Sequence, residues 1–490
     1  MLAVEHLDFA YPPPGAGLPA TAALRDVSFH LEHGETLAVM GASGSGKSTL
    51  CHVLAGLAPR YTGGHVAGVV RVAGHDVLAT MPPTGAVGLL FQDAATQLFN
   101  PTVEDEVAWG LEALGTPPQH IGAQVEEALA RFGLLPVRAG SPWTLSGGQQ
   151  KRLALAAVWA MHPHVLLLDE PLGGLDPQGC DEVLAALATL HHSGTTLLLT
   201  TARAPAVALA PLTLLLTDGM ATSPASTAEV LQDEARLVKA GVLYPSALWP
   251  TFEAPPGPSS ESAVAVQDLH FAYTDGHAAL HGVNLDIPQG QFVAVIGPNG
   301  AGKSTLLRHF NGLLRPTRGA VYIQGQDAAG RPTGDLAREV GFLFQRPEQQ
   351  LFAATVREEV AFGVRRLHLA DVEGRVERAL ARFELTAHAE MPPSILSYGA
   401  QRAVTLAALA ALDTPILALD EPTVGLDGCD WARLLAWLAE RRAAGTTLII
   451  VTHEMELAAR ADRVVALAEG RVVADGAPDE VLSGPAEATL

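Results

Sequence analysis

Two stretches of the sequence place glycine, lysine and serine in the same order and at the same spacing. Residues 41–48 read GASGSGKS and residues 297–304 read GPNGAGKS, so both match the pattern G-x-x-x-x-G-K-[ST]. Each follows a short apolar run and precedes a helical pattern, which is the context in which such a sequence forms a phosphate-binding loop. Glycines allow successive backbone N–H groups to face phosphate oxygens at the positive end of the helix. We therefore expect a nucleotide at each loop.

The side chains at the end of each loop have distinct expected roles. Lys47 and Lys303 would bridge the β- and γ-phosphates, and Ser48 and Ser304 would ligate Mg²⁺. These are two of only four lysines in the chain, where arginine supplies most of the positive charge. The residues expected to contact nucleotide are Gly41, Ser43, Gly44, Gly46, Lys47, Ser48 and Thr49, and in the second stretch Gly297, Asn299, Gly300, Gly302, Lys303, Ser304 and Thr305.

A pair of acidic residues closes an apolar strand pattern after each loop. The sequence reads LLLDEP around Asp169 and LALDEP around Asp420. A carboxylate in this position suits a Mg²⁺ ion held through water, which we assign to the two aspartates. The next residues, Glu170 and Glu421, would polarise the attacking water. An acidic turn at a strand end would not explain why both stretches repeat Asp-Glu-Pro.

The recurrence of these motifs in one order indicates a tandem duplication. VEHLDFAY at Val4 returns as VQDLHFAY at Val266, and FQDAATQLF at Phe91 returns as FQRPEQQLF at Phe344. Short apolar runs alternate with amphipathic patterns in each copy, which predicts an α/β fold with parallel strands. We expect a first domain over residues 1–243 and a second over 263–490. Residues 244–262, rich in Pro and Ser, would link them.

Composition limits the classes of partner. The chain has 490 residues and a net charge of −21, which argues against broad nucleic-acid binding because phosphate contacts need clustered cations. No apolar run is long enough to span a bilayer and no secretory signal is evident, so we expect a cytosolic chain. The three cysteines lack metal-ligand spacing and are expected to be reduced thiols.

The segment LSGGQQKR from Leu145, between the first phosphate loop and LLLDEP, resembles the signature of ATP-binding cassette ATPases. The resemblance covers nearly the whole chain. It implies two P-loop cassettes, each with a mainly parallel sheet, an antiparallel β subdomain and a helical signature subdomain. It also implies that the cassettes stack head to tail, with ATP and Mg²⁺ between the phosphate loop of one and the signature of the other.

The same resemblance implies further site residues. Tyr11 and Tyr273 would stack on adenine, although a tyrosine in the core is the alternative. Gln92 and Gln345 would ligate the metal, sense the γ-phosphate and respond to a membrane partner. His453 would contact the γ-phosphate, and Asp176 and Asp427 would lie where the cassettes meet. The signature residues expected to bind phosphate are Ser146, Gly147 and Gly148, with Ser397 and Gly399 in the second copy.

The two copies differ in ways that predict unequal sites. The second signature reads LSYGAQRA, so Tyr398 stands opposite Gly147, and Ala202 stands opposite His453. Head-to-tail pairing puts both departures in the site of Lys47, and leaves the site of Lys303, Glu421 and His453 complete. We expect both sites to bind Mg-ATP and the Lys303 site to carry most hydrolysis. The alternative is that Tyr398 is a tolerated variant.

The segments QLFNPTVEDEVAWG and QLFAATVREEVAFG resemble the ATPases of energy-coupling factor transporters. That resemblance implies a membrane T-component, a substrate-binding S-component, a vitamin-like molecule or transition-metal ion as cargo, and a location at the cytoplasmic face of the membrane. Five acidic residues would meet basic partner residues, or simply favour the helix dipole: Glu104, Asp105, Glu106, Glu358 and Glu359. The fused ATPase of a sugar importer and a soluble twin-cassette ATPase acting on ribosomes or DNA are the alternatives.

Overall fold

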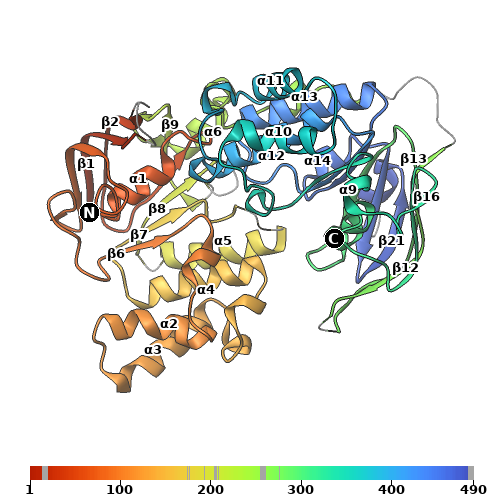
Figure 1. Ribbon diagram of the computed structural model, residues 1–490. Helices are drawn as coiled ribbons and strands as arrows, with labels where there is room; N and C mark the ends of the chain where they lie inside the picture. The colour runs from red at the N-terminus through yellow and green to blue at the C-terminus, as the bar shows by residue number, and fades with distance from the viewer. Residues whose placement is uncertain are drawn as a thin grey trace. The chain divides into compact units, whose positions relative to one another are not determined.

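The computed structural model describes residues 1–13, 20–173, 175, 177–192, 194–202, 207, 209–253, 261–274 and 276–483. These residues form two compact units, one of Met1–Leu243 with Asp427–Cys429 and the other of Tyr244–Leu426 with Asp430–Leu490. Asp176 and residues 254–260 of the expected linker lie outside the described residues. Figure 1 shows the helices and strands of both units.

The first unit contains two sheets. The antiparallel sheet has the order β2-β1-β4-β5, and the larger sheet has the order β10-β9-β3-β8-β7-β6 with β11 paired to β9. The strands of the antiparallel sheet are β1 (Leu2–Tyr11), β2 (Thr21–Leu31), β4 (His65–Val72) and β5 (His75–Asp76). The strands of the larger sheet are β3 (Thr36–Met40), β6 (Val87–Leu90), β7 (Val165–Asp169), β8 (Thr196–Thr201), β9 (Leu212–Thr217), β10 (Met220–Ala221) and β11 (Ala225–Ser226).

Helices of the first unit cover the larger sheet and form a separate group beside it. Figure 1 shows α2, α3 and α4 together as that group, drawn in orange and yellow. The α-helices are α1 (Lys47–Leu54), α2 (Val103–Ala113), α3 (Pro118–Arg131), α4 (Gly147–Ala160), α5 (Pro177–His192), α6 (Thr227–Gln232) and α7 (Glu234–Lys239). Short 3₁₀ turns occur at η1 (Ala94–Gln97), η2 (Leu135–Val137) and η3 (Pro142–Thr144).

The second unit repeats this architecture. Its antiparallel sheet has the order β13-β12-β15-β16 and its larger sheet the order β17-β18-β19-β14-β20-β21. The strands are β12 (Ser262–Ala272), β13 (Ala278–Pro288), β14 (Phe292–Ile296), β15 (Arg318–Ile323), β16 (Gln326–Asp327), β17 (Val340–Leu343), β18 (Ile416–Asp420), β19 (Thr447–Val451), β20 (Arg463–Ala468) and β21 (Arg471–Gly476). The helices are α8 (Lys303–Phe310), α9 (Thr333–Leu336), α10 (Val356–Arg366), α11 (Val372–Arg382), α12 (Tyr398–Leu412), α13 (Gly428–Ala443), α14 (Met455–Ala458) and α15 (Pro478–Leu482), and the 3₁₀ turns are η5 (Ser246–Leu248), η6 (Pro347–Gln349), η7 (Thr386–His388) and η8 (Pro393–Ile395).

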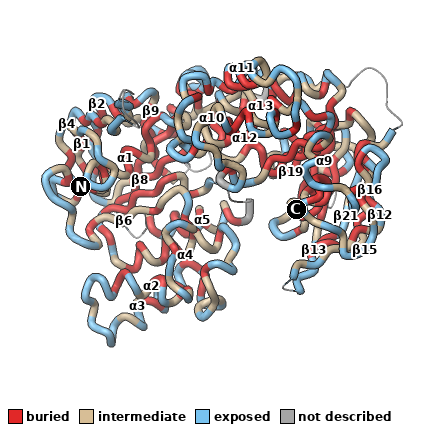
Figure 2. The backbone as a smooth tube through the Cα atoms, in the orientation of Figure 1, coloured by how far each residue is buried: buried red, intermediate tan, exposed pale blue. Residues whose placement is uncertain are grey.

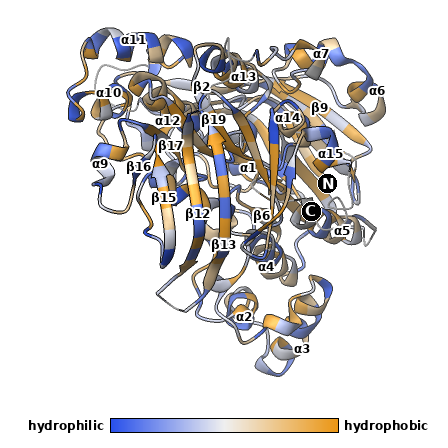
Figure 3. Ribbon diagram, turned by 90° about the vertical axis from the view of Figure 1, so that its right-hand side faces the viewer, coloured by the Kyte–Doolittle hydropathy of each residue, from blue (hydrophilic) through white to orange (hydrophobic). Residues whose placement is uncertain are grey.

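The predicted parallel strands are confirmed. In the first unit β3, β6, β7 and β8 pair in parallel, and in the second unit β14, β17, β18 and β19 do the same. Apart from β6, where Val87 and Leu89 are partly buried, these strands are almost fully buried, as Figures 2 and 3 show for the apolar strand β19. Parallel strands end at one edge of a sheet, so the loops that follow them gather there. Those loops carry the predicted site residues.

The start of the expected linker packs against the second unit. The Trp249 ring stacks on Trp431 of α13 with centroids 5.1 Å apart, and the Arg460 guanidinium lies 4.9 Å from the Trp249 centroid. Phe252 lies against Phe292 of β14, with ring centroids 5.1 Å apart. Residues 244–253 therefore add aromatic side chains to the edge of this unit's core.

Candidate active site

The phosphate loops adopt the tight backbone that their glycines predict. Gly46 and Gly302 precede helices α1 and α8 with φ values of 107° and 96°. L-residues rarely adopt such angles, so glycine is required there. Gly297 is needed for a second reason, because a Cβ at this position would lie 2.1 Å from the Leu467 carbonyl oxygen. Each loop thus turns directly into the start of a helix.

Both loop lysines fold back over their own loops. Lys47 Nζ donates to the carbonyls of Gly41 at 2.8 Å and Ala42 at 2.9 Å. Lys303 Nζ donates to the carbonyls of Gly297 at 2.6 Å and Pro298 at 2.9 Å. Each ammonium therefore lies across its loop, at the place where phosphate oxygens would replace the carbonyls as partners.

The acidic pairs lie at the same sheet edge as the loops. Asp169 and Asp420 are the last residues of β7 and β18 and are buried. Glu170 and Glu421 follow with φ of 48° and 49°, in the left-handed region that residues with a side chain rarely adopt. A strained non-glycine backbone is kept only where the surroundings fix it, and such positions gather at active sites. The strain occurs in both copies.

Burial controls the protonation of these glutamates. It raises the pKa of Glu421 to about 8, with Lys303 opposing the change and Asp420 adding to it. Burial also raises the pKa of Glu170, against the opposing charge of Lys47, whose Nζ lies 3.6 Å from Glu170 Oε1. A carboxylate with a raised pKa takes a proton from water more readily, so both glutamates suit a general base.

The aspartates and loop serines suit a magnesium ion. Burial raises the pKa of Asp420, while a hydrogen bond with the Ser304 side chain acts in the opposite direction. Asp420 Oδ1 is buried and has no hydrogen-bond partner among the described residues. An oxygen-rich set of this kind fits Mg²⁺, which when bound would offset negative charge on the β- and γ-phosphates. In the first copy Asp169 Oδ1 accepts from the Thr200 hydroxyl at 2.6 Å.

The two glutamates differ in the residue that faces them from the loop after the neighbouring strand, β8 in the first unit and β19 in the second. Each accepts a hydrogen bond from the backbone of the equivalent residue, which is Ala202 for Glu170 and His453 for Glu421. In the second copy the imidazole adds a polar contact, with His453 Nε2 lying 3.2 Å from Glu421 Oε1. Of the two glutamates, only Glu421 therefore has a neighbouring side chain that could orient it or relay its proton.

Each predicted adenine tyrosine is attached to its phosphate loop. The Tyr11 hydroxyl lies 3.1 Å from Thr49 Oγ1, and the Tyr273 hydroxyl lies 2.9 Å from Thr305 Oγ1. Both tyrosines are partly buried at the ends of β1 and β12. The rings are thus held beside the loops, as stacking on a bound base would require.

The glutamine loops contain residues that the sequence interpretation missed. Gln97 accepts from the Phe91 N–H at 2.8 Å and donates to the Leu89 carbonyl at 2.9 Å. Gln350 makes the equivalent contacts with Phe344 and Phe342, at 3.1 Å each. These side chains fix the strand end that precedes Gln92 and Gln345. Gln97 and Gln350 could have been recognised in the sequence, because they recur at the same position of FQDAATQLF and FQRPEQQLF.

The two signatures begin their helices differently. Ser146 caps α4, and Gln149 returns a hydrogen bond to the Ser146 N–H at 3.0 Å, which completes a capping box. Ser397 caps α12 by accepting from the Ala400 N–H at 3.3 Å, and the methyl side chain of Ala400 cannot reciprocate. Gly147 is exposed, whereas Tyr398 at the equivalent position is partly buried.

Comparison with known proteins identifies the family. The ABC transporter family matches residues 24–173 and 280–424, one region in each copy. The chain belongs to the ABC transporter family. A Methanosarcina acetivorans protein called "Putative ABC transporter ATP-binding protein" is 34% identical over 99% of this chain and 87% of its own length. A Streptomyces avermitilis protein of the same name is 37% identical over 98% of this chain and 95% of its own length.

Solved ABC structures match one copy at a time. One is cbiO1 from Clostridium perfringens, described as part of the ABC transporter complex cbiONQ. It is 34% identical over 46% of this chain and 92% of its own length, with a TM-score of 0.41.

Family membership confirms three predictions. This ABC transporter protein consists of two ATP-binding cassettes of α/β fold, it is an ATPase, and its cofactors are ATP and Mg²⁺. Among the helices described for this ABC protein, none combines the length and apolar character needed to cross a bilayer.

Proposed function

We propose that this chain is the ATP-hydrolysing subunit of an energy-coupling-factor importer, bound to the cytoplasmic face of the membrane. Its partners are a membrane T-component and a substrate-binding S-component, and the cargo is a vitamin-like molecule or a transition-metal ion. The observation that carries the proposal is a pair of exposed aromatic rings beside each glutamine loop.

The aromatic pairs occupy equivalent positions in the two units. Phe99 and Trp109 are 58% and 52% exposed, and their rings meet edge to face with centroids 5.0 Å apart. Phe352 and Phe362 are 65% and 48% exposed, with centroids 4.7 Å apart and the same geometry. Exposed large apolar side chains that gather in one place mark interaction surfaces. Their repetition supports a partner that contacts both cassettes with similar apolar elements.

Buried glutamates hold these aromatic surfaces in shape. Glu106 Oε2 accepts from the Phe99 and Asn100 N–H groups at 2.9 and 2.8 Å. Glu359 Oε2 accepts from the Phe352 and Ala353 N–H groups at 2.8 and 2.7 Å. The expectation that Glu106 and Glu359 meet basic partner residues is therefore wrong, because both carboxylates face inward and bind their own chain.

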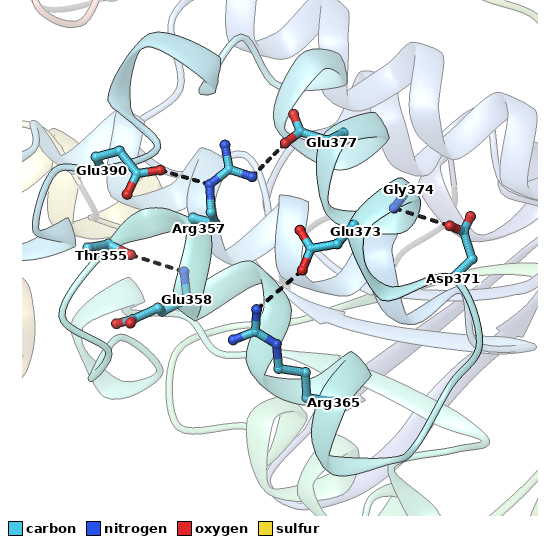
Figure 4. Close-up of polar contacts among 9 residues, drawn as sticks. All are labelled: Thr355, Arg357, Glu358, Arg365, Asp371, Glu373, Gly374, Glu377 and Glu390. Carbon is cyan, nitrogen blue, oxygen red and sulfur yellow. Dashed lines mark hydrogen bonds and ion pairs between the residues drawn. The ribbon is translucent and has the colours of Figure 1, made fainter.

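The other charges beside these surfaces are also largely paired. Glu104 Oε2 accepts from Arg138 Nε at 2.5 Å. At the position equivalent to Glu104, Arg357 contacts Glu377 at 2.5 Å and Glu390 at 2.8 Å, as Figure 4 shows. Exposed pairs of this kind contribute little free energy. The apolar rings, rather than the acids, are thus the main support for a partner.

The two nucleotide sites of the proposed subunit are unequal. In the head-to-tail arrangement, Lys303, Asp420, Glu421 and His453 work with the first signature at Ser146. The Lys47 site has Ala202 in place of histidine and the altered signature at Ser397. The capping box at Ser146 and the polar contact between His453 and Glu421 support the Lys303 site as the more active one. Loss of a single transition-state contact costs roughly 10²–10³ in rate.

Site-specific photocrosslinking tests the membrane assignment. Benzoylphenylalanine replaces Trp109 or Phe362 in the full chain, with Met220 of β10 as an equally exposed control at 56%. In native cells, we expect crosslinks from the first two positions to a multispanning membrane protein, and none from Met220. Reconstitution with that protein in vesicles should stimulate ATP hydrolysis. Crosslinks to ribosomal proteins or to DNA from positions 109 and 362 would contradict the proposal and favour the soluble twin-cassette alternative.

A further inference from the structure

The two signature helices carry a buried cation at the same position but use it differently. Lys151 and Arg402 both lie five residues after the capping serine and are 5% and 0% exposed. Lys151 Nζ donates to the Glu170 carbonyl at 3.0 Å and to the Gly173 carbonyl at 2.7 Å, in the loop that follows β7. In the first cassette the signature helix is thus attached to the loop of the catalytic glutamate.

In the second cassette the cation is attached to the glutamine loop. Arg402 Nη1 donates to the Phe344 carbonyl at 2.6 Å, and Nη2 donates to the Gln345 carbonyl. The Tyr398 hydroxyl lies 3.4 Å from the same Gln345 oxygen and 3.4 Å from Arg402 Nη2. A guanidinium presents parallel donors in a rigid fork, which suits two consecutive carbonyls better than an ammonium does.

Tyr398 occupies space beside the loop that follows Glu421. Its ring lies against Gly425, where an added Cβ would come within 2.4 Å of Cδ1 and 2.5 Å of Cε1 of the tyrosine. Gly425 belongs to the loop after Glu421, which corresponds to the loop that Lys151 contacts in the first cassette. The tyrosine therefore fills the side of the helix start that faces this loop. The Arg402 Cζ lies 5.9 Å from the centre of the tyrosine ring.

We propose that Tyr398 and Arg402 form a clasp that makes the glutamine loop and the start of α12 move as one body. Both are positioning residues. When ATP binds at Lys303 and Gln345 adjusts to the γ-phosphate, the clasp carries that movement to Ser397 and Gly399. In the head-to-tail arrangement of the proposed function, those two residues serve the Lys47 site. Tyr398 then connects the glutamine loop to the start of α12, in addition to replacing a glycine of the signature.

Hydrogen exchange of the full chain tests the clasp without a membrane partner, so a failed membrane assignment leaves this test intact. The background is Glu421→Gln, which slows hydrolysis and holds the ATP state. Peptides spanning 340–353 and 396–406 are followed with and without Mg-ATP, and we expect both to gain protection together. In Arg402→Ala, the 340–353 response should persist, and the 396–406 response should fall roughly tenfold, because a hydrogen bond to a charged group is worth at least that factor in an equilibrium constant.

Arg375→Ala provides the matched control. Arg375 Nη1 donates to the Ala411 carbonyl at 3.0 Å, so this variant removes an arginine contact from the other end of α12. It should leave the 396–406 response unchanged. Arg402→Lys is the second variant. In the first cassette the equivalent Lys151 contacts the loop after the catalytic glutamate, so a lysine at position 402 should release the glutamine loop.

The proposal is overturned if 396–406 responds fully to Mg-ATP in a folded Arg402→Ala or Arg402→Lys chain. It is also overturned if Arg375→Ala abolishes the response equally, because the effect would then be general loosening of α12. In wild-type background, we expect Arg402→Lys to lower kcat and leave KM for ATP within about twofold, since the phosphate loop and Tyr273 stay in place.

Discussion

The difference between the two catalytic glutamates can be measured by removing each in turn. Glu421→Gln keeps the size of the side chain and abolishes the base. The Glu421 carboxylate follows β18 at the sheet edge that holds the phosphate loop, and its Oε1 lies 3.2 Å from His453 Nε2, so its position suits a base for the attacking water. General-base catalysis is worth roughly 10²–10⁴ in rate, or about 3–5 kcal/mol in the barrier. We expect kcat of the full chain to fall by that factor.

Glu170→Gln is the matched variant in the other cassette. Glu170 has the same strained backbone and a raised pKa, but Ala202 offers no side-chain partner at the equivalent position. If most turnover occurs at the Lys303 site, kcat should stay within about twofold of the wild type. Steady-state phosphate release at saturating Mg-ATP gives kcat for both variants.

Strict coupling of the sites would reduce steady-state turnover equally in both variants, so a single-turnover measurement is needed as well. Radiolabelled azido-ATP is trapped, and the labelled half is identified after cleavage near the linker. In Glu421→Gln, uncleaved ATP should accumulate on Lys303-site peptides. The reasoning about unequal sites fails if the two variants lose activity equally and each traps ATP to the same extent in both halves.

Three further predictions concern the stability of the second unit, its dependence on pH, and the aromatic surface that Glu106 holds in place. Trp249→Ala removes the stacking on Trp431 and should lower the melting temperature of the second unit by roughly 5–10 °C, from about 2–3 kcal/mol of lost packing; calorimetry should find almost no change for Trp143→Ala, whose side chain is 57% exposed. Because Glu421 binds a proton in the folded chain that the unfolded chain releases near its ordinary pKa of 4.5, stability should decline as the pH rises from about 5 to about 8. Urea denaturation of the nucleotide-free Glu421→Gln chain should find a flatter decline over that range, and an unchanged slope would contradict the assignment. Glu106→Ala leaves the Phe99 and Asn100 N–H groups without their acceptor, at a cost of about 1–3 kcal/mol, and a crosslinker at Trp109 should then lose its partner while ATP binding persists.

Local sequence was sufficient for most of the cassette fold and for the nucleotide loops. The pattern around Lys47 requires a strand, a glycine turn and a helix start within a dozen residues, and all three are present. The acidic pair at Asp420 also follows from its position at the end of an apolar strand. These features are encoded by neighbours in the chain, so a single sequence contains them.

Contacts between distant segments could not be predicted in the same way. The contacts of the buried cations in α4 and α12 depend on which loop, distant in the sequence, packs against the start of each helix, and no periodicity records that. The role of Glu106 could not be predicted either, since an acid at a helix start satisfies the dipole in either orientation. The packing of Trp249 was missed because the Pro- and Ser-rich composition around it indicated a plain linker.

The attachment of each adenine tyrosine to its phosphate loop bears on nucleotide choice. The hydroxyls of Tyr11 and Tyr273 are engaged with Thr49 and Thr305, so each ring can offer a bound base only its face. A ring face does not distinguish one purine from another, because both present a similar aromatic surface. We therefore expect GTP to replace ATP with a modest loss of affinity, and this motor would draw on whichever purine triphosphate the cell holds in excess.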